Sequence, residues 1–125
     1  MSIVIRSGRL TAAAAASLAG LLLVGPALAQ TQEGTASFYS DKFEGKKTAS
    51  GQAYDKSALT ASHKKLPYGT KVQVTNLANG KSVVVTVNDR MAQSNKSVIE
   101  LSRKAAEELD FTKSGKTKVK LEVQK

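Results

Sequence analysis

The chain of 125 residues has no cysteine and no tryptophan, and it has only two prolines, one histidine and six other aromatic residues. Without cysteine no disulfide can cross-link the fold, so stability must come from packing, which favours a closed β structure over a loop-rich scaffold. One histidine and no cysteine leave mainly carboxylates as metal ligands, so we expect neither a metal site nor a cofactor. With three tyrosines and three phenylalanines, the sequence shows no stacking platform for nucleic-acid bases.

Acidic residues are also scarce. Ten Asp and Glu stand against 19 Lys and Arg, which gives a formal net charge of +9. A basic balance normally suggests nucleic acid as a partner, because Lys and Arg neutralise phosphates and release counterions. The lysines here are scattered along the chain, so we interpret most of this charge as solvated surface.

The first 29 residues have the pattern of a secretory signal peptide. Two arginines precede an apolar run at 11–24, which leads to the sequence Ala-Leu-Ala at 27–29. This order predicts cleavage after Ala29 and a mature domain of residues 30–125. A retained membrane anchor is the weaker alternative, because the apolar run is shorter than the roughly 18–20 residues that span a bilayer.

Export would determine which partners the mature domain meets. Removing two arginines and no acid leaves 17 basic and ten acidic residues, a net charge of +7. No cysteine follows the signal, so we expect no lipid anchor and a periplasmic or secreted protein. Outside the cytoplasm a basic protein meets anionic wall polymers and membrane surfaces rather than nucleic acid.

The remaining sequence predicts one mainly β domain with about six short strands and one short helix. The clearest strand is SVVVTVNDR at 82–90, because β-branched side chains prefer the extended chain. Asn79-Gly80 before it predicts a hairpin. Ser102 can cap a helix of about eight to nine residues. The other strands are expected at 34–39, 57–62, 70–77, 97–101 and 117–123. A closed, antiparallel-rich barrel would leave no exposed edge on so small a sheet.

A carboxylate at the end of the central strand is the first candidate for chemistry. Burying Asp89 costs several kcal/mol unless it is paired or protonated, so its position suggests a use. The alternative is that Asp89 and Arg90 only begin a solvated turn. Asp55, His63 and Glu100 are further candidates, with Gln52 beside them.

Two reaction classes fit these residues unequally. A Ser/His/Asp triad can be written with Ser62 or Ser57, but the nucleophile-elbow pattern is missing. Paired carboxylates that act on a glycosidic bond fit better, since this chemistry needs a protonated acid at the leaving oxygen and a base nearby.

Short motifs in order along the chain resemble the rare lipoprotein A family. The matching segments are GTASFY at 34–39, TASG at 48–51, AYD at 53–55, ALTA at 58–61, His63, LPYGT at 66–70, VTN at 74–76, Asn79-Gly80, NDR at 88–90 and IELS at 99–102. The resemblance implies a six-stranded double-psi β-barrel, related to the first domain of expansins. It also implies lytic transglycosylase activity on peptidoglycan glycan strands, preferentially strands without stem peptides.

The family's functional residues are present with three departures. The resemblance places its Asp, His and second Asp at Asp55, His63 and Asp89. The family's usual Glu is Gln52 here, and its usual Asp before Leu-Ser is Glu100. A third difference lies after Arg90, where Met91-Ala92 replaces Gly-Pro. An amide cannot exchange a proton near neutral pH, so Gln52 can only hydrogen-bond the sugar.

A lytic transglycosylase can work with a single carboxyl group. It protonates the glycosidic oxygen and then takes the proton of the sugar's own 6-hydroxyl as that oxygen closes the anhydro ring. We therefore assign Asp89 as general acid and base, assisted by Asp55 and His63. A carboxylate near Asp89 would favour its protonated form.

Other residues are assigned as glycan contacts, and each has a structural alternative. The predicted contacts are Gln52, Thr35, Tyr39, Arg90 and Glu100. Tyr39 could equally pack in the core, and Glu100 could be an ion-pair partner of an arginine. His63 could be bonded to backbone at the end of a strand.

Two other functions stay open at this point. In the first, the same groove holds glycan strands without cleaving them, an alternative that rests on Gln52, Met91 and Ala92. In the second, a secreted protein binds another protein through its basic surface.

Overall fold

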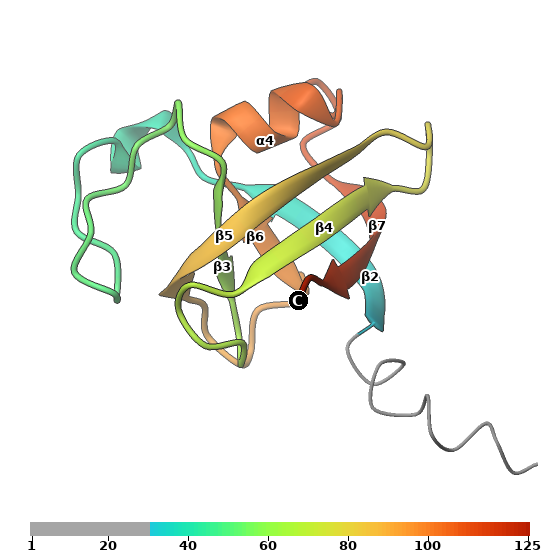
Figure 1. The fold of residues 1–125 in the computed structure, drawn as a ribbon. Helices are drawn as coiled ribbons and strands as arrows, with labels where there is room; N and C mark the ends of the chain where they lie inside the picture. Colours follow the sequence, from blue (N-terminus) through green and yellow to red (C-terminus); the bar gives the residue numbers. More distant parts are fainter. Residues whose placement is uncertain (1–30) are drawn as a thin grey trace, which may run out of the picture. The chain divides into compact units, whose positions relative to one another are not determined.

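The computed structural model describes residues 31–125, and the predicted signal peptide lies outside the described residues. The elements in chain order are β2 (Thr31–Phe38), the 3-10 turn η3 (Asp41–Phe43), β3 (Thr60–His63), β4 (Lys71–Asn76), β5 (Ser82–Arg90), β6 (Ile99–Leu101), α4 (Arg103–Glu108) and β7 (Thr117–Val123) (Figure 1). A long loop joins β2 to β3 and lies to the left of the barrel in Figure 1.

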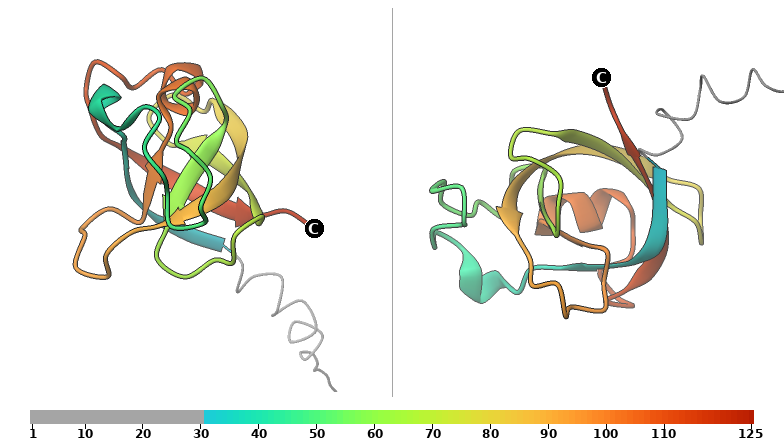
Figure 2. Two further views of the ribbon diagram at one scale, coloured as in Figure 1. Left: turned by 90° about the vertical axis from the view of Figure 1, so that its left-hand side faces the viewer. Right: turned by 90° about the horizontal axis from the view of Figure 1, so that it is seen from below.

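The six strands form a closed barrel in the order β2-β6-β3-β5-β4-β7. Two neighbouring pairs, β2 with β6 and β3 with β5, are parallel, and the other four pairs are antiparallel. Viewed from below, the strands form a ring with the helix seen through it (Figure 2). The expected closed six-stranded barrel with one helix is confirmed.

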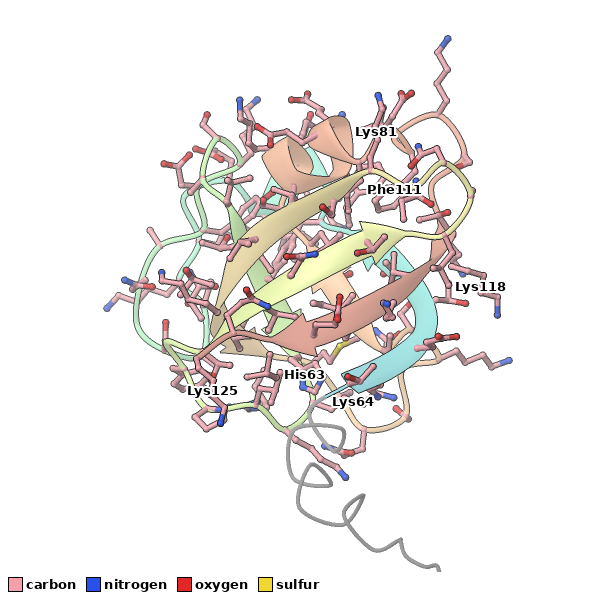
Figure 3. The ribbon with its side chains drawn as sticks, turned by 45° about the vertical axis from the view of Figure 1, so that its right-hand side comes forward. His63, Lys64, Lys81, Phe111, Lys118 and Lys125 are labelled. Atoms are coloured by element: carbon pink, nitrogen blue, oxygen red, sulfur yellow. The ribbon has the colours of Figure 1, made fainter. Side chains whose placement is uncertain are left out.

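Alternating valines and other aliphatic residues point into the barrel and form its core. The fully or nearly fully buried residues include Val72 and Val74 of β4, Val85 and Val87 of β5, Ile99 and Leu101 of β6, and Val119 and Leu121 of β7. Helix α4 adds Ala105 and Ala106 to this cluster, and Leu109 and Phe111 follow it. Figure 3 shows Phe111 and His63 toward opposite ends of the barrel.

Five elements differ in their bounds from the sequence prediction; β4 and β6 are only shorter than expected, and the other three differ more. Strand β2 begins at Thr31, because its polar first residues pair with β7 from Thr31 opposite Glu122. The strand predicted at 57–62 runs from Thr60 to His63, since the preceding residues form a turn. The helix has six residues because Asp110 adopts a left-handed backbone, with φ of 58°, and the chain turns away.

Within residues 31–125, no helix has the length and apolar character that crossing a membrane requires.

Candidate active site

A bulge in β5 sets the direction of the Asp89 side chain. Ala61 of β3 is opposite Val87, but the next residue, Ser62, is opposite Asp89, so Asn88 is an extra residue on β5. Regular alternation would place Asp89 on the same face as Val87, inside the core. The extra residue reverses the face, and Asp89 becomes half-buried on the outer side of the barrel.

The bulge brings Asp89 into line with a second carboxylate across three strands. Ser62 pairs with Asp89 on one side and with Glu100 of β6 on the other. Because the residues before and after Glu100 are fully buried core residues, the Glu100 side chain must lie on the outer face. The two acidic residues are two strand spacings apart at the backbone, about 10 Å. Their side chains can bring the carboxyl groups to a separation that flanks one glycosidic bond.

Three hydrogen-bond donors converge on the Asp89 carboxylate. The Tyr39 hydroxyl donates to Oδ2 at 2.6 Å. The N–H of Ala49 donates to Oδ1 at 2.8 Å, and the N–H of Arg90 donates to the same oxygen at 2.9 Å. These contacts come from the residue after β2, from the long loop and from β5, so they fix the orientation of the carboxylate from three directions.

Tyr39 is itself held firmly in place. Its ring stacks on that of Tyr54, with centroids 4.4 Å apart and planes at 12°. Its backbone N–H donates to the carbonyl oxygen of Leu101 at 2.9 Å. Burial, with the hydrogen bond to Asp89, raises the pKa of Tyr39 far above its ordinary value, so this residue is a permanent hydroxyl donor.

The surroundings of Glu100 favour its protonated form. Its side chain is half-buried, and burial together with the negative charge of Asp89 raises the pKa of Glu100 above its ordinary value of 4.5. Both side chains lie in the one row on the outer face, so the charge of Asp89 disfavours a second negative charge on Glu100. An acid whose protonated form is favoured, in one row with a carboxylate that accepts three hydrogen bonds, is an arrangement suited to acid–base chemistry.

Gln52 lies at the same end of β5 and contacts it. The Nδ2 of Asn88 donates to Gln52 Oε1 at 3.1 Å, so the bulge residue fixes the side-chain amide. The Gln52 carbonyl oxygen accepts from the N–H and the hydroxyl of Thr48, which closes the tip of the loop. Gln52 is exposed, and it is bonded to Asn88, the residue before Asp89. This position suits a residue that contacts the substrate.

His63 is buried, and its ring is occupied by the fold. Nδ1 accepts from the N–H groups of Lys65 and Leu66 at 3.0 and 3.1 Å, so the neutral ring carries its proton on Nε2. Nε2 then donates to Gln32 Oε1 at 3.0 Å. Burial and the nearby cations, Arg90 first, lower the pKa of His63. These contacts favour the alternative of a histidine bonded to backbone at a strand end.

Asp55 and Thr35 have local partners rather than contacts with Asp89. The Asp55 carboxylate accepts from the N–H of Ser57 at 2.8 Å, which makes a local turn, and the residue is exposed. Thr35 lies on β2, where its carbonyl oxygen accepts from the N–H of Val98 at 2.8 Å. By alternation, its side chain shares the outer face with Ser37, the residue that pairs with Glu100.

Arg90 links the end of β5 to the segment that follows β3. Its guanidinium donates to the carbonyl oxygens of His63 and Leu66 at 3.0 and 2.8 Å and lies 4.7 Å from the ring centroid of Tyr68. Arg103 pairs with Asp41 at 2.8 Å. The alternative that paired Glu100 with one of these arginines therefore has no support in the geometry.

Sequence reasoning missed two features of the site. The contacts from Ala49 and Tyr39 to Asp89 join residues that are 40 and 50 positions apart. No local sequence pattern predicts such contacts. Phe43 was also missed, although a large apolar residue in a polar loop was a visible signal. It is 39% exposed and packs edge-on against Tyr39, with centroids 6.1 Å apart.

In the part of the chain that the structure describes, no three residues of the His, Cys, Asp and Glu types gather into a group that could hold a metal ion.

A family model described as lytic transglycolase matches residues 31–121, nearly the whole of the described barrel. The chain belongs to this lytic transglycolase family. The expected double-psi β-barrel is thereby confirmed, as is the resemblance from which it was inferred.

Several curated relatives of this family member carry the name endolytic peptidoglycan transglycosylase RlpA. The Campylobacter jejuni protein is 47% identical over 97 residues, which are 78% of this chain and 35% of the relative. The Pseudomonas aeruginosa protein is 51% identical over 71% of this chain and 26% of the relative. For the Rickettsia bellii protein the identity is 50%, over 74% of this chain and 42% of the relative. The chain thus spans well under half the length of these relatives.

Solved structures share the fold at low identity. An expansin from Clavibacter michiganensis, solved in complex with cellohexaose, has a TM-score of 0.61 at 19% identity, covering 76% of this chain and 50% of that one. The Streptomyces papain inhibitor has a TM-score of 0.58 at 22% identity, covering 77% of this chain and 96% of that one. An inhibitor and an expansin on one scaffold show that the fold alone does not decide the function.

Proposed function

We propose that this protein is a lytic transglycosylase that cleaves the glycan strands of peptidoglycan and leaves 1,6-anhydro-muramyl ends. The observation that carries the proposal is the outward-facing Asp89, held by three donors in one row with the half-buried Glu100. Peptidoglycan as substrate comes from the names of the relatives, which are about 50% identical to this chain.

The two carboxyl groups divide the reaction between them. Glu100 gives its proton to the glycosidic oxygen as the bond from that oxygen to C1 of the muramyl residue breaks. The 6-hydroxyl oxygen of the same muramyl residue then bonds to C1, and Asp89 accepts the hydroxyl proton. No water is consumed, and solvent returns each carboxyl group to its starting state. Asp89 also places a negative charge beside the positive charge that develops on the sugar ring.

This division changes the role first assigned to Asp89 and explains how Gln52 can be tolerated. Asp89 remains a catalytic residue, mainly as base, while Glu100 becomes the acid rather than a simple glycan contact. Gln52, fixed by Asn88, hydrogen-bonds sugar hydroxyl or N-acetyl groups without exchanging protons. Asp55 and His63 support the loop and the strand end, because Asp55 Oδ1 and His63 Nδ1 accept from backbone N–H groups there.

The setting of the reaction is also part of the proposal. Peptidoglycan lies outside the cytoplasmic membrane, which agrees with a signal peptide at 1–29 and a mature domain at 30–125. We place the protein in the periplasm or outside the cell, with glycan strands as its partner.

Site variants test the proposal on purified peptide-free glycan strands. The expected result is that the parent protein produces anhydro-muramyl ends, detected by mass spectrometry, and that Asp89→Asn and Glu100→Gln each lose this activity while staying folded. Gln52→Glu is a parallel arm. If only Gln52→Glu cleaves the strands, the present chain is a glycan-binding module, the candidate function that the amide at position 52 favours. If Asp89→Asn keeps the parent's rate, the proposed site is wrong.

A further inference from the structure

A second group of charged side chains lines a surface cavity outside the Asp89 site. The cavity has a volume of about 320 Å³, and its lining comes from two segments: Lys56, Ser57, Arg103, Lys104 and Glu107. Three of these residues are cations and one is an acid, so the cavity carries a net positive charge. Its volume is at the lower end of the range for small-ligand sites, roughly 300–1,000 Å³.

Backbone hydrogen bonds fix the two walls of the cavity against each other. The N–H of Lys104 donates to the carbonyl oxygen of Lys56 at 2.9 Å, which ties the long loop to α4. The N–H of Arg103 donates to the Tyr54 hydroxyl at 3.1 Å. The guanidinium of Arg103 also donates to Asp41 at 2.8 Å, in a partly exposed ion pair.

The same contacts connect the cavity to the active site. Tyr54, which accepts from Arg103, stacks on Tyr39, and Tyr39 donates to Asp89. The cavity and the proposed catalytic carboxylate are therefore separated by one pair of stacked tyrosines.

We propose that the cavity of Lys56, Arg103 and Lys104 binds a carboxylate of the peptidoglycan strand next to the bond that is cleaved. This proposal rests on the proposed function. Each muramyl residue carries a lactyl ether whose carboxylate is free in a peptide-free strand and is an amide in a peptide-bearing strand. In the second case carboxylates are found on the stem peptide instead. Cationic side chains on two facing walls are suited to either source.

The acids already present near the cavity do not prevent this. Lys104 pairs with Glu108 at 3.5 Å and Arg103 with Asp41, and all four side chains are at least one-third exposed. Exposed ion pairs of this kind are weak and exchange readily for another carboxylate. Glu107 contributes one opposing charge, which leaves the cavity able to release its ligand after cleavage.

Binding to a non-cleaving protein tests the assignment. Asp89→Asn is titrated by calorimetry with peptide-free strands, with the same strands after their lactyl carboxylates have been converted to neutral amides, and with peptide-bearing strands. Lys56→Glu is then added, and Lys113→Glu is the control, since Lys113 is an exposed lysine outside the cavity and its replacement changes the net charge equally. Circular dichroism checks that each variant is folded.

The expected result is that Lys56→Glu weakens binding of carboxylate-bearing strands about fivefold, as for an exposed charge pair, while Lys113→Glu has no such effect. A loss confined to peptide-free strands identifies the lactyl carboxylate as the ligand, and a loss confined to peptide-bearing strands identifies the stem peptide. Equal losses for Lys56→Glu and Lys113→Glu, or no loss for Lys56→Glu on either kind of strand, would overturn the proposal, and unchanged binding of the amidated strands would exclude the lactyl carboxylate as the ligand. Cleavage by the parent protein is measured separately, so a protein that binds through Lys56 without cleaving refutes only the proposed function.

Discussion

Replacing Tyr39 by phenylalanine removes a single oxygen atom from the proposed site. The phenol oxygen is 2.6 Å from Asp89 Oδ2, whereas the ring is held by its stack on Tyr54 and its edge contact with Phe43. A phenylalanine ring keeps both ring contacts. The substitution therefore tests the hydrogen bond with little change in packing.

The expected magnitude follows from the kind of bond that is lost. Hydrogen bonds to charged groups contribute about 1.5–3 kcal/mol, and partial exposure of the Asp89 pair favours the lower end. A loss of about 1.4 kcal/mol in transition-state stabilisation corresponds to a tenfold lower rate. Because Oδ1 keeps its donors from Ala49 and Arg90, we expect kcat to fall about tenfold for Tyr39→Phe, rather than a complete loss of activity.

The assay is release of anhydro-muramyl ends at several strand concentrations, which separates kcat from KM. Tyr68→Phe is the matched control, since Tyr68 is 44% exposed and packs on Arg90 instead of contacting Asp89. We expect the control to keep the parent's kcat. An unchanged kcat for Tyr39→Phe, in a preparation where Asp89→Asn is inactive, would refute the positioning role of this hydroxyl.

Four further predictions concern stability, pH and substrate binding. Asn76→Ala should lower the free energy of unfolding by about 2 kcal/mol in denaturant titrations, because the buried Asn76 amide donates to Leu109 and accepts from Ala78 and Thr117; an unchanged midpoint would contradict this. Asp110→Gly should raise it by about 0.5–1 kcal/mol, since glycine adopts the left-handed backbone at φ of 58° without strain, and a lower melting temperature would show that the side chain contributes more than its strain costs. The raised pKa of Glu100 means that its carboxyl group binds a proton more tightly in the folded state than in the unfolded state. The contribution of this group to the free energy of unfolding is therefore complete below pH 4.5 and is lost as the pH rises through the pKa of the folded state. Glu100→Gln should therefore become progressively more stable relative to the parent as the pH rises above 4.5, and a pH-independent difference would argue against the shift. Phe43→Ala should raise KM for glycan strands about fivefold with little change in kcat, if the exposed ring packs on a sugar face, and an unchanged KM would exclude that contact.

The strands and the hairpin could be predicted from the sequence because their determinants are local. The β-branched run at 82–90 matches β5 at both ends, and the Asn79-Gly80 turn joins β4 to β5 as expected. Gly80 has φ of 81°, the left-handed backbone for which the Asn-Gly pattern selects. Closure of the barrel agreed with the general argument that so small a sheet must hide its edges.

The assembly of the site could be predicted only in part, because its determinants are long-range. The motif at 88–90 indicated Asp89, but the bulge that turns it outward exists only in the register between β3 and β5. A resemblance pointed to Asp55 and His63, whereas Asp55 Oδ1 and His63 Nδ1 accept from nearby backbone N–H groups in the fold. Glu100 was noted as a contact, and its raised pKa depends on burial and on Asp89, neither of which is visible along the chain.

Cleavage in water enriched in oxygen-18 tests the central claim most directly. A lytic transglycosylase closes the muramyl ring with the sugar's own 6-hydroxyl, so the new ends should be 1,6-anhydro-muramyl residues that contain no oxygen-18. New reducing ends that carry oxygen-18 would show hydrolysis by an activated water. Intact strands after prolonged incubation with folded protein would show a binding module, and either result would contradict the account.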